Sequence, residues 1–197
     1  MKLRVIATLV AILAFGAGSA SAQSIGIFAD LGSSSCNITT PMYATTSFYI
    51  NVVGSGALSP PGVNGAEFKV THSIVGGVDA IITVVPNAAA NVALGDPMGT
   101  GCNIAFPACQ VGASVNLYEI QLFTLAPANP GMNGLIGITG HDNPSNVNFQ
   151  CALVNKCDAP TFTAVCVATG EASLNGNQDC NVAVEETSWS TVKGLYN

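Results

Sequence analysis

One register in the C-terminal stretch has the spacing of a calcium loop. Four residues with side-chain oxygens, Asn175, Asn177, Asp179 and Glu186, fall where such a loop places its first, second, third and last ligands. Cys180 occupies the position at which these loops need glycine for a sharp turn. Because the glycine is missing and only two carboxylates remain, the stretch is better explained as a β-hairpin turn and a strand, and we expect no calcium-dependent stabilisation.

Histidine is the next residue type that could carry chemistry. His141 is followed by Asp142, but neighbouring side chains of an extended chain point apart and do not orient one another. The sequence has no G-x-S-x-G motif, and its acidic residues are scattered. We therefore predict no catalytic residue and no cofactor. A secreted hydrolase that uses His141 and Asp142 is kept as a second alternative.

Seven cysteines follow the N-terminal region. They are Cys36, Cys102, Cys109, Cys151, Cys157, Cys166 and Cys180. No C-x-x-C pair occurs, so the spacing does not fit a tetrahedral metal site, and we predict disulfides instead. The odd number predicts three bridges and one free thiol.

Local pairing is our hypothesis for these bridges. Cys166 would join Cys180 across a terminal hairpin, and Cys151–Cys157 and Cys102–Cys109 would each close a short loop. These pairs leave Cys36 unpaired. Pairing of Cys36 with Cys102 or Cys109 is an alternative that the sequence leaves open.

Aromatic residues that could stack on a sugar are few. Tyr49 alternates with Phe48 and Ile50, so we expect it to face solvent from a strand. A sugar site needs exposed aromatic rings near amides and acids. Tyr43 and Tyr49 are therefore the candidate ligand contacts.

The first 22 residues have the three parts of a secretory signal. Lys2 and Arg4 precede an apolar run over residues 5–15, and residues 20–22 (ASA) suit signal peptidase. No stretch is long and apolar enough to span a membrane, so we expect a secreted protein. Without Lys2 and Arg4, three lysines stand against all eleven acidic residues, a net charge of −8. This balance disfavours nucleic-acid and anionic-membrane partners.

Short segments that alternate apolar and polar residues dominate the rest of the chain. In AEFKVT, for example, Ala66, Phe68 and Val70 share one face. Comparable segments lie at 25–30, 47–53, 80–85, 115–123, 134–139, 147–154, 161–168 and 181–184. Loops rich in Gly, Pro and Asn separate them. About nine or ten strands of this kind predict an antiparallel β-sandwich.

The chain is expected to have three parts. Residues 1–22 would be the signal peptide, 23–160 the β-sandwich domain, and 161–197 a C-terminal hairpin and short helix packed on the sandwich. In that helix Trp189, Val192, Leu195 and Tyr196 would form the apolar side.

Two sets of motifs resemble known secreted β proteins. GVNGAEFKVT (62–71), followed by VNLYEIQLFTLAP (115–127) and GLIGITG (134–140), resembles the strand order of cohesin-like and carbohydrate-binding sandwich modules. IGIFAD and SCNIT near the start, with VAVEETSWSTVKGLY at the end, resemble the two ends of a group of small secreted bacterial β-sandwich proteins. The first resemblance implies a sandwich that binds a protein or a glycan, and the second implies no activity.

These observations predict a secreted, non-catalytic binding or structural protein of the cell surface or extracellular space. Its partner would be a protein or a glycan. A carbohydrate-binding or cohesin-like adhesion module is the first alternative. The long polar loops and the small number of ionisable groups suit display of a surface better than proton transfer.

Overall fold

Two β-sheets packed against each other form the protein. The computed structural model describes residues 23–54, 62–157, 163–177 and 180. These residues contain thirteen β-strands and one short 3-10 helix, η1 (Pro130–Met132). The all-β sandwich predicted from the alternating segments is confirmed, with more strands than the nine or ten expected.

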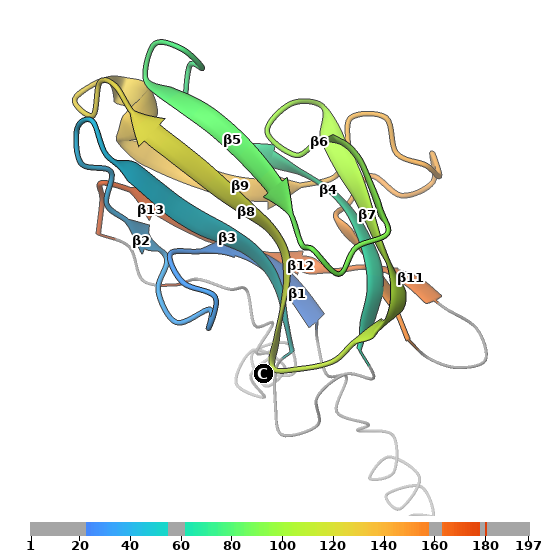
Figure 1. Ribbon diagram of the computed structural model, residues 1–197. Coiled ribbons are helices and arrows are strands. Elements are labelled where there is room, and N and C mark those ends of the chain that lie inside the picture. The colour runs from blue at the N-terminus through green and yellow to red at the C-terminus, as the bar shows by residue number, and fades with distance from the viewer. Residues whose placement is uncertain (1–22, 55–61, 158–162, 178–179, 181–197) are drawn as a thin grey trace, which may run out of the picture.

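The first sheet has five strands. In spatial order they are β12 (Ala168–Thr169), β1 (Gln23–Phe28), β3 (Thr45–Gly54), β8 (Ser114–Thr124) and β5 (Ala80–Pro86). All neighbours are antiparallel except the short parallel pair of β1 and β12. The strands β3, β8 and β5 lie side by side toward the viewer in Figure 1. Within the described residues β8 is the only strand that pairs with β5, and the other edge of β5 is free beyond Ala80, which forms an isolated bridge with Gly76.

The second sheet has eight strands around β4. In order these are β11 (Thr163–Cys166), β10 (Leu153–Lys156), β4 (Val63–Thr71), β9 (Gly134–Thr139), β13 (Glu171–Leu174) and β2 (Asn37–Ile38). β7 (Gly101–Gln110) also pairs with β4, and β6 (Val92–Asp96) pairs with β7. The first part of β4 contacts β10 and β7, and its last three residues contact β9.

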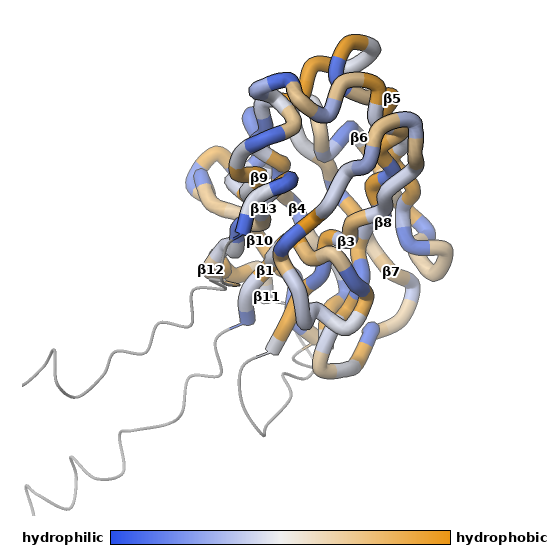
Figure 2. Tube along the Cα trace, turned by 90° about the vertical axis from the view of Figure 1, so that its left-hand side faces the viewer, coloured by the Kyte–Doolittle hydropathy of each residue, from blue (hydrophilic) through white to orange (hydrophobic). Residues whose placement is uncertain are grey.

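The core lies between the two sheets. Ala66, Phe68 and Val70 on β4 are buried, as their alternation predicts. Phe68 meets Tyr118 of the opposite sheet edge-on, with 5.9 Å between ring centroids. Figure 2 shows the corresponding alternation of hydrophobic and hydrophilic residues along the trace. The two inner faces therefore interdigitate to make one core.

Several strands were not predicted. The longest is β7, in which Cys102, Ile104 and Phe106 face the core. Pro107 argues against a strand, since proline cannot donate to the ladder. It is accommodated because the pairing of β7 with β4 shifts register between Ala105 and Gln110. β6 lies within a stretch that we expected to be a loop, and β2 and β13 are too short for a visible period.

One predicted strand begins later than expected. Residues 147–151 were assigned to a strand that continues to residue 154, but the strand starts at Leu153. Asn146 forms a turn instead, because its side-chain oxygen accepts the N–H of Asn148 at 3.0 Å and its carbonyl accepts the N–H of Phe149 at 3.0 Å.

The described C-terminal residues belong to both sheets, and the second strand of the predicted hairpin, at 181–184, lies outside the described residues. β11 pairs with β10, β12 with β1, and β13 with β9 and β2. β11 and β13 are not neighbours. The predicted signal peptide and C-terminal helix lie outside the described residues.

The three disulfides are Cys36–Cys180, Cys109–Cys157 and Cys151–Cys166, with Cα atoms 5.2, 6.0 and 5.6 Å apart. All local pairings proposed from the sequence are therefore wrong, and the free thiol is Cys102 rather than Cys36.

Strand geometry explains these corrections. Cys102 and Cys109 lie on one strand seven residues apart, roughly 23 Å at 3.3 Å per residue, and β10 separates Cys151 from Cys157 in the same way. Cys166 and Cys180 lie at opposite ends of the eight-stranded sheet, since β11 and β2 are its outer strands. Bridges need Cα atoms within about 7 Å, so none of these pairs can form.

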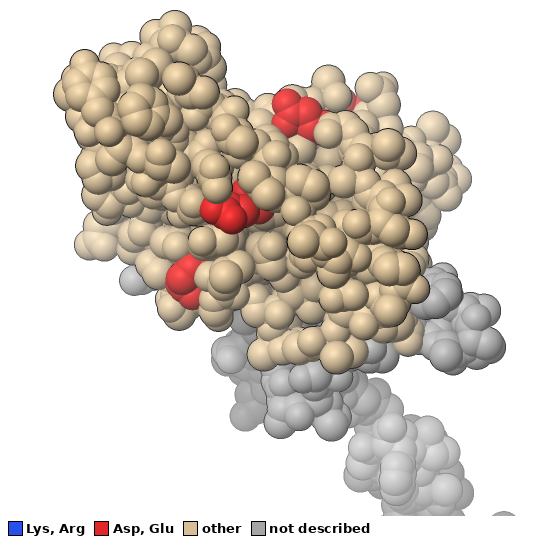
Figure 3. All heavy atoms as spheres, in the orientation of Figure 1, with Lys and Arg blue, Asp and Glu red and all other residues tan. Residues whose placement is uncertain are grey.

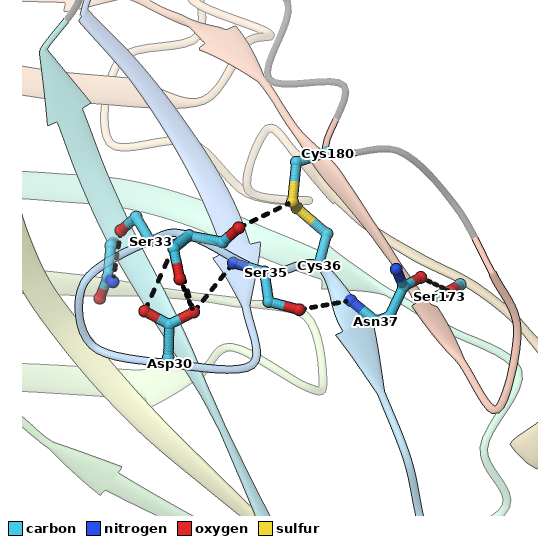
Figure 4. The surroundings of a disulfide bond; sticks show 9 residues. Asp30, Ser33, Ser35, Cys36, Asn37, Ser173 and Cys180 are labelled. Carbon is cyan, nitrogen blue, oxygen red and sulfur yellow. Dashed lines mark hydrogen bonds between the residues drawn. A yellow bond between two sulfur atoms is a disulfide. The ribbon is translucent and has the colours of Figure 1, made fainter.

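The Cys36–Cys180 bridge lies beside a tight loop after β1, as Figure 4 shows. Asp30 holds this loop by accepting the N–H groups of Ser34 and Ser35 and the Ser34 hydroxyl. Desolvation raises the pKa of Asp30, but these hydrogen bonds outweigh it and leave the pKa below its usual value.

Candidate functional site: the two outer faces of the sandwich

The outer surface of β3, β8 and β5 is open to solvent. We define the open face by three cross-strand rows, Thr45–Phe123–Ile81, Ser47–Gln121–Thr83 and Tyr49–Glu119–Val85. These side chains point away from the core, because Phe48 and Ile120 between them are fully buried. The molecular face in Figure 3, seen in the same orientation as Figure 1, shows separate acidic groups and no lysine or arginine.

The rest of this sheet is covered. Asn51 on β3 is fully buried, although it points outward like Tyr49. Its amide donates to the Leu31 carbonyl at 3.3 Å and to Ser33 Oγ at 2.8 Å, and its Oδ1 accepts from Asn116 at 2.9 Å. The loop after β1 is thus held over the C-terminal part of β3. The outer surface of this sheet therefore has one covered part and one open part.

A hydrogen-bonded polar group lies in the middle of the open face. The Ser47 hydroxyl donates to Glu119 Oε1 at 2.6 Å, and the Gln121 amide donates to the same oxygen at 3.0 Å. These two bonds, that of Ser47 first, hold the pKa of the Glu119 carboxyl below its usual value. Glu119 is therefore ionised at neutral pH and orders both neighbours.

One end of the open face is apolar. Ile81 and Phe123 are direct cross-strand partners, 53% and 37% exposed. Tyr43 is 67% exposed in the adjoining loop, where its backbone N–H donates to the Thr124 carbonyl at 2.8 Å. Its φ of 56° is in the left-handed region, which a non-glycine residue occupies only when its surroundings hold it there. The exposed residues Met42, Tyr43, Val78, Ile81 and Phe123 are called the apolar end below.

The two tyrosines predicted as ligand contacts both belong to this surface. Tyr49 is half-buried beside Glu119, and Tyr43 lies at the apolar end. Four residues of β3 separate the row of Tyr49 from that of Thr45, roughly 13 Å. The two rings therefore form no shared stacking platform. Sequence reasoning missed Ile81 and Phe123, because only strand pairing places them side by side.

The outer surface of the eight-stranded sheet carries a groove. Its floor is one cross-strand row of mostly small residues, Val92, Ala105, Gly65, Asn155 and Ala164 on β6, β7, β4, β10 and β11. The next row contains Leu94, Asn103, Glu67, Leu153 and Cys166. Gly65 is required, since a β-carbon there would lie 2.7 Å from the Ile104 carbonyl oxygen. The resulting groove has a volume of about 310 Å³.

The segment 140–151 contributes Ser145 to the lining of this groove and is called the wall below. The two ends of this segment lie close together, because a β-carbon on Gly140 would lie 2.6 Å from the Gln150 carbonyl oxygen. The Cys151–Cys166 bridge fastens its end to β11. Inside the wall, the Ser145 N–H donates to both carboxylate oxygens of Glu67 at 3.1 Å. Glu67 points outward from β4, since its neighbours Ala66 and Phe68 face the core, but it lies under this wall and is only 4% exposed.

His141 and Asp142 lie in the wall but are not paired with each other. The His141 ring packs over Gly101, and its Nδ1 accepts the N–H of Asn143 at 2.9 Å. The Asp142 carboxylate is held by the Lys69 ammonium at 2.8 and 2.9 Å. Each side chain thus has its own structural partner, an arrangement that gives no support to the hydrolase hypothesis.

The side chain of Asn175, the first residue of the calcium register, forms hydrogen bonds with two other segments of the chain. Its Oδ1 accepts the N–H of Thr40 at 2.8 Å, and its amide donates to Thr40 Oγ1 at 2.6 Å and to the Met132 carbonyl at 2.9 Å. The side-chain oxygen Oδ1 that would bind calcium thus already accepts a hydrogen bond. Asp179 and Glu186 lie outside the described residues, so the calcium hypothesis itself remains untested.

The free thiol of Cys102 is inert. Burial raises the pKa of this thiol to about 12, and Tyr118 lies beside it. A nucleophilic cysteine needs the thiolate, which this environment suppresses. Among the described residues no three His, Cys, Asp or Glu side chains are grouped to hold a metal ion, and no helix has the length and apolarity to cross a bilayer.

No protein-family model and no curated protein matches the chain. Solved structures do: the chain is similar in fold to cohesin modules. A cohesin module of a family 33 glycoside hydrolase from Clostridium perfringens shares 10% identity, covering 80% of this chain and 99% of that one, with a TM-score of 0.45. The seventh ScaB type I cohesin of Pseudobacteroides cellulosolvens shares 8%, covering 80% and 94%, with a TM-score of 0.47.

A type II cohesin domain from the cellulosome of Acetivibrio cellulolyticus is a third example. It shares 12% identity, covering 78% of this chain and 95% of that one, with a TM-score of 0.46. The expected resemblance was to cohesin-like modules, and these solved structures are cohesin modules. At such identities and TM-scores the ligand has to be inferred from this chain's own surface.

Proposed function

We propose that the chain is a secreted, non-catalytic adhesion module that binds a partner protein through its open face. The observation that carries the proposal is the apolar end, where Ile81, Phe123 and Tyr43 are exposed together. Single exposed apolar residues are common on soluble proteins, whereas a contiguous group of large ones marks an interaction surface.

The free edge of β5 supports the same surface. Beyond Ala80, whose carbonyl accepts the Gly77 N–H, the backbone N–H and C=O groups along this edge have no partner strand within the described residues. Such an edge can take a strand from another chain, with the neighbouring apolar side chains supplying contact area. A partner that covers the apolar end would lie directly beside the edge.

Secretion and the absence of catalysis rest on separate observations. The predicted signal peptide and the three disulfides suit an oxidising compartment. The single His–Asp dipeptide is divided between structural partners, and the free cysteine is buried.

A glycan is the second candidate ligand, on one specific ground. Half-buried Tyr49 lies next to the ordered Ser47–Glu119–Gln121 group. An aromatic ring beside fixed donors and acceptors is the combination that holds a sugar ring.

Partner capture by matched variants tests the proposal. The mature chain from residue 23 is immobilised and exposed to proteins extracted from the surface of the producing organism. Ile81→Asp/Phe123→Asp should lose the partners that the wild type retains, because two charges would be buried in the interface. Val111→Asp/Val147→Asp, which charges two isolated exposed sites, should retain them. Equal capture by both double variants would contradict the proposal.

A glycan array tests the second candidate in parallel. Binding that Tyr49→Ala abolishes and Ile81→Asp/Phe123→Asp leaves intact would favour the sugar over the protein. Thermal melting of every variant confirms that it is folded.

A further inference from the structure

The buried carboxylate of Glu67 has little to balance it. It is 4% exposed, and within the part of the chain that the structure describes its two oxygens share one N–H donor, that of Ser145. It makes no ion pair with any described residue, because the nearest lysine on its strand, Lys69, is bound to Asp142. A buried charge normally has an opposite charge or several hydrogen bonds, so the one Ser145 N–H balances the charge of Glu67 only in part.

Groups that can accept further hydrogen bonds surround it. Asn103 is the direct cross-strand neighbour of Glu67 and makes no side-chain hydrogen bond within the described residues. Asn155 donates its amide to Asn64 at 3.2 Å, which leaves the Asn155 Oδ1 as an acceptor. All three side chains line the groove. An ammonium group brings three donors and one positive charge, which matches a carboxylate with two amide oxygens near it.

The remainder of the groove is suited to a hydrocarbon stem. Gly65, Ala105 and Ala164 form a low floor, and Val92 and Leu153 line the groove beside them. A hydrated divalent cation would instead need several carboxylates, and the groove has one. The arrangement fits an amphipathic group with an apolar stem and a charged end.

We propose that this groove binds a primary alkylammonium group, with its charge on Glu67 and its stem on the floor formed by Gly65, Ala105 and Ala164. Lysine side chains and small free amines share this chemistry. The site lies on the eight-stranded sheet, so it is independent of the open face and of the function proposed for it.

Titration of the ¹⁵N-labelled mature chain at pH 7 tests the proposal. The probes are n-butylamine, an ammonium at this pH, and its neutral match n-butanol. Butylamine should shift the backbone amides of Glu67, Asn103 and Ser145 in a saturable manner, and butanol should not. Equal shifts with butanol, or shifts confined to another surface, would overturn the proposal.

Variants identify the charge that is responsible. Glu67→Gln keeps an acceptor for the Ser145 N–H and should weaken butylamine binding at least tenfold. Asn103→Ala leaves that hydrogen bond intact, so it tests the groove even if Glu67→Gln fails to fold, and it should weaken binding severalfold. Glu171→Gln removes an exposed carboxylate on β13 and should change nothing. Unchanged binding by Glu67→Gln or Asn103→Ala, or a loss in Glu171→Gln equal to theirs, would overturn the assignment.

A second pair of probes distinguishes the two sources of the ammonium group. If Nα-acetyl-lysine methylamide binds as tightly as butylamine, and acetylation of its Nε amine abolishes this binding, the natural ligand is a lysine side chain. Binding of butylamine alone identifies a small free amine. If neither probe binds, the proposal is wrong, whereas partner capture through the open face would be unaffected.

Discussion

The open face and the groove are the outer surfaces of the two sheets of one sandwich, yet they differ in what covers them. On the open face apolar side chains such as Ile81 and Phe123 reach solvent. In the groove the charged side chain of Glu67 is buried under the segment 140–151. Strand alternation therefore determines only the direction of a side chain. Long-range loops and bridges determine its environment.

The wall of the groove should depend most strongly on one bridge. Cys151→Ser/Cys166→Ser opens a loop of sequence separation 15, which should lower the free energy of unfolding by about 3 kcal/mol. Since the bridge fastens segment 140–151, butylamine binding should be lost while partner capture through the open face persists. Urea unfolding and the NMR titration measure the two effects.

Cys109→Ser/Cys157→Ser is the matched control. It removes a bridge of sequence separation 48, and the longer loop should cost somewhat more stability, about 4 kcal/mol. The groove should still bind butylamine, because this bridge does not hold the wall. If both double variants lose butylamine binding equally, the loss reflects a general decrease in the stability of the fold. The role proposed for segment 140–151 would then be wrong.

The division of the five-stranded sheet into covered and open parts predicts a smaller effect. Asn51→Ala removes three hydrogen bonds of a fully buried side chain, and should lower the free energy of unfolding by about 2 kcal/mol. Gln121→Ala on the open face should change it by less than about 0.5 kcal/mol. Equal losses in urea unfolding would show that the open face is covered as well.

The smallest effect concerns Glu119. Its folded pKa lies below the unfolded value of about 4.5, so its stabilising contribution is present above that pH and is lost as the pH falls through the folded pKa. Glu119→Gln should reduce stability at pH 7 by about 0.5 kcal/mol, since the site is partly exposed. The difference should shrink in unfolding experiments below pH 4.5. A difference that does not change with pH would mean that the Ser47 and Gln121 bonds do not depend on the charge.

The sequence predicts the inner faces of the sheets well and the outer faces poorly. Phe48, Phe68 and Ile120 are buried as their alternation requires, because alternation reports the direction of a side chain. The outward residues Glu67 and Ile81 carry the same periodic signal, yet one is buried and the other exposed. The difference comes from segment 140–151, which is distant in sequence from both.

The disulfide pairing predicted from the sequence is wrong for a similar reason. Sequence separation favours near neighbours such as Cys151 and Cys157, but extended strands carry near neighbours apart. Cys36 and Cys180 are 144 residues apart; Cys36 directly precedes β2, and Cys180 lies six residues after β13, the strand that pairs with β2. Strand order, which decides these contacts, leaves no local signal in the sequence.

Amide hydrogen exchange of the chain bound to a partner captured by the wild type tests the central claim most directly. The account predicts that exchange slows along β5, at residues 80–85, and at Tyr43 and Phe123, because the partner would cover the apolar end and pair with the free edge. Exchange along β4, β7 and β10 in the groove should remain as in the free chain. Protection confined to the groove strands, with β5 unchanged, would contradict the account.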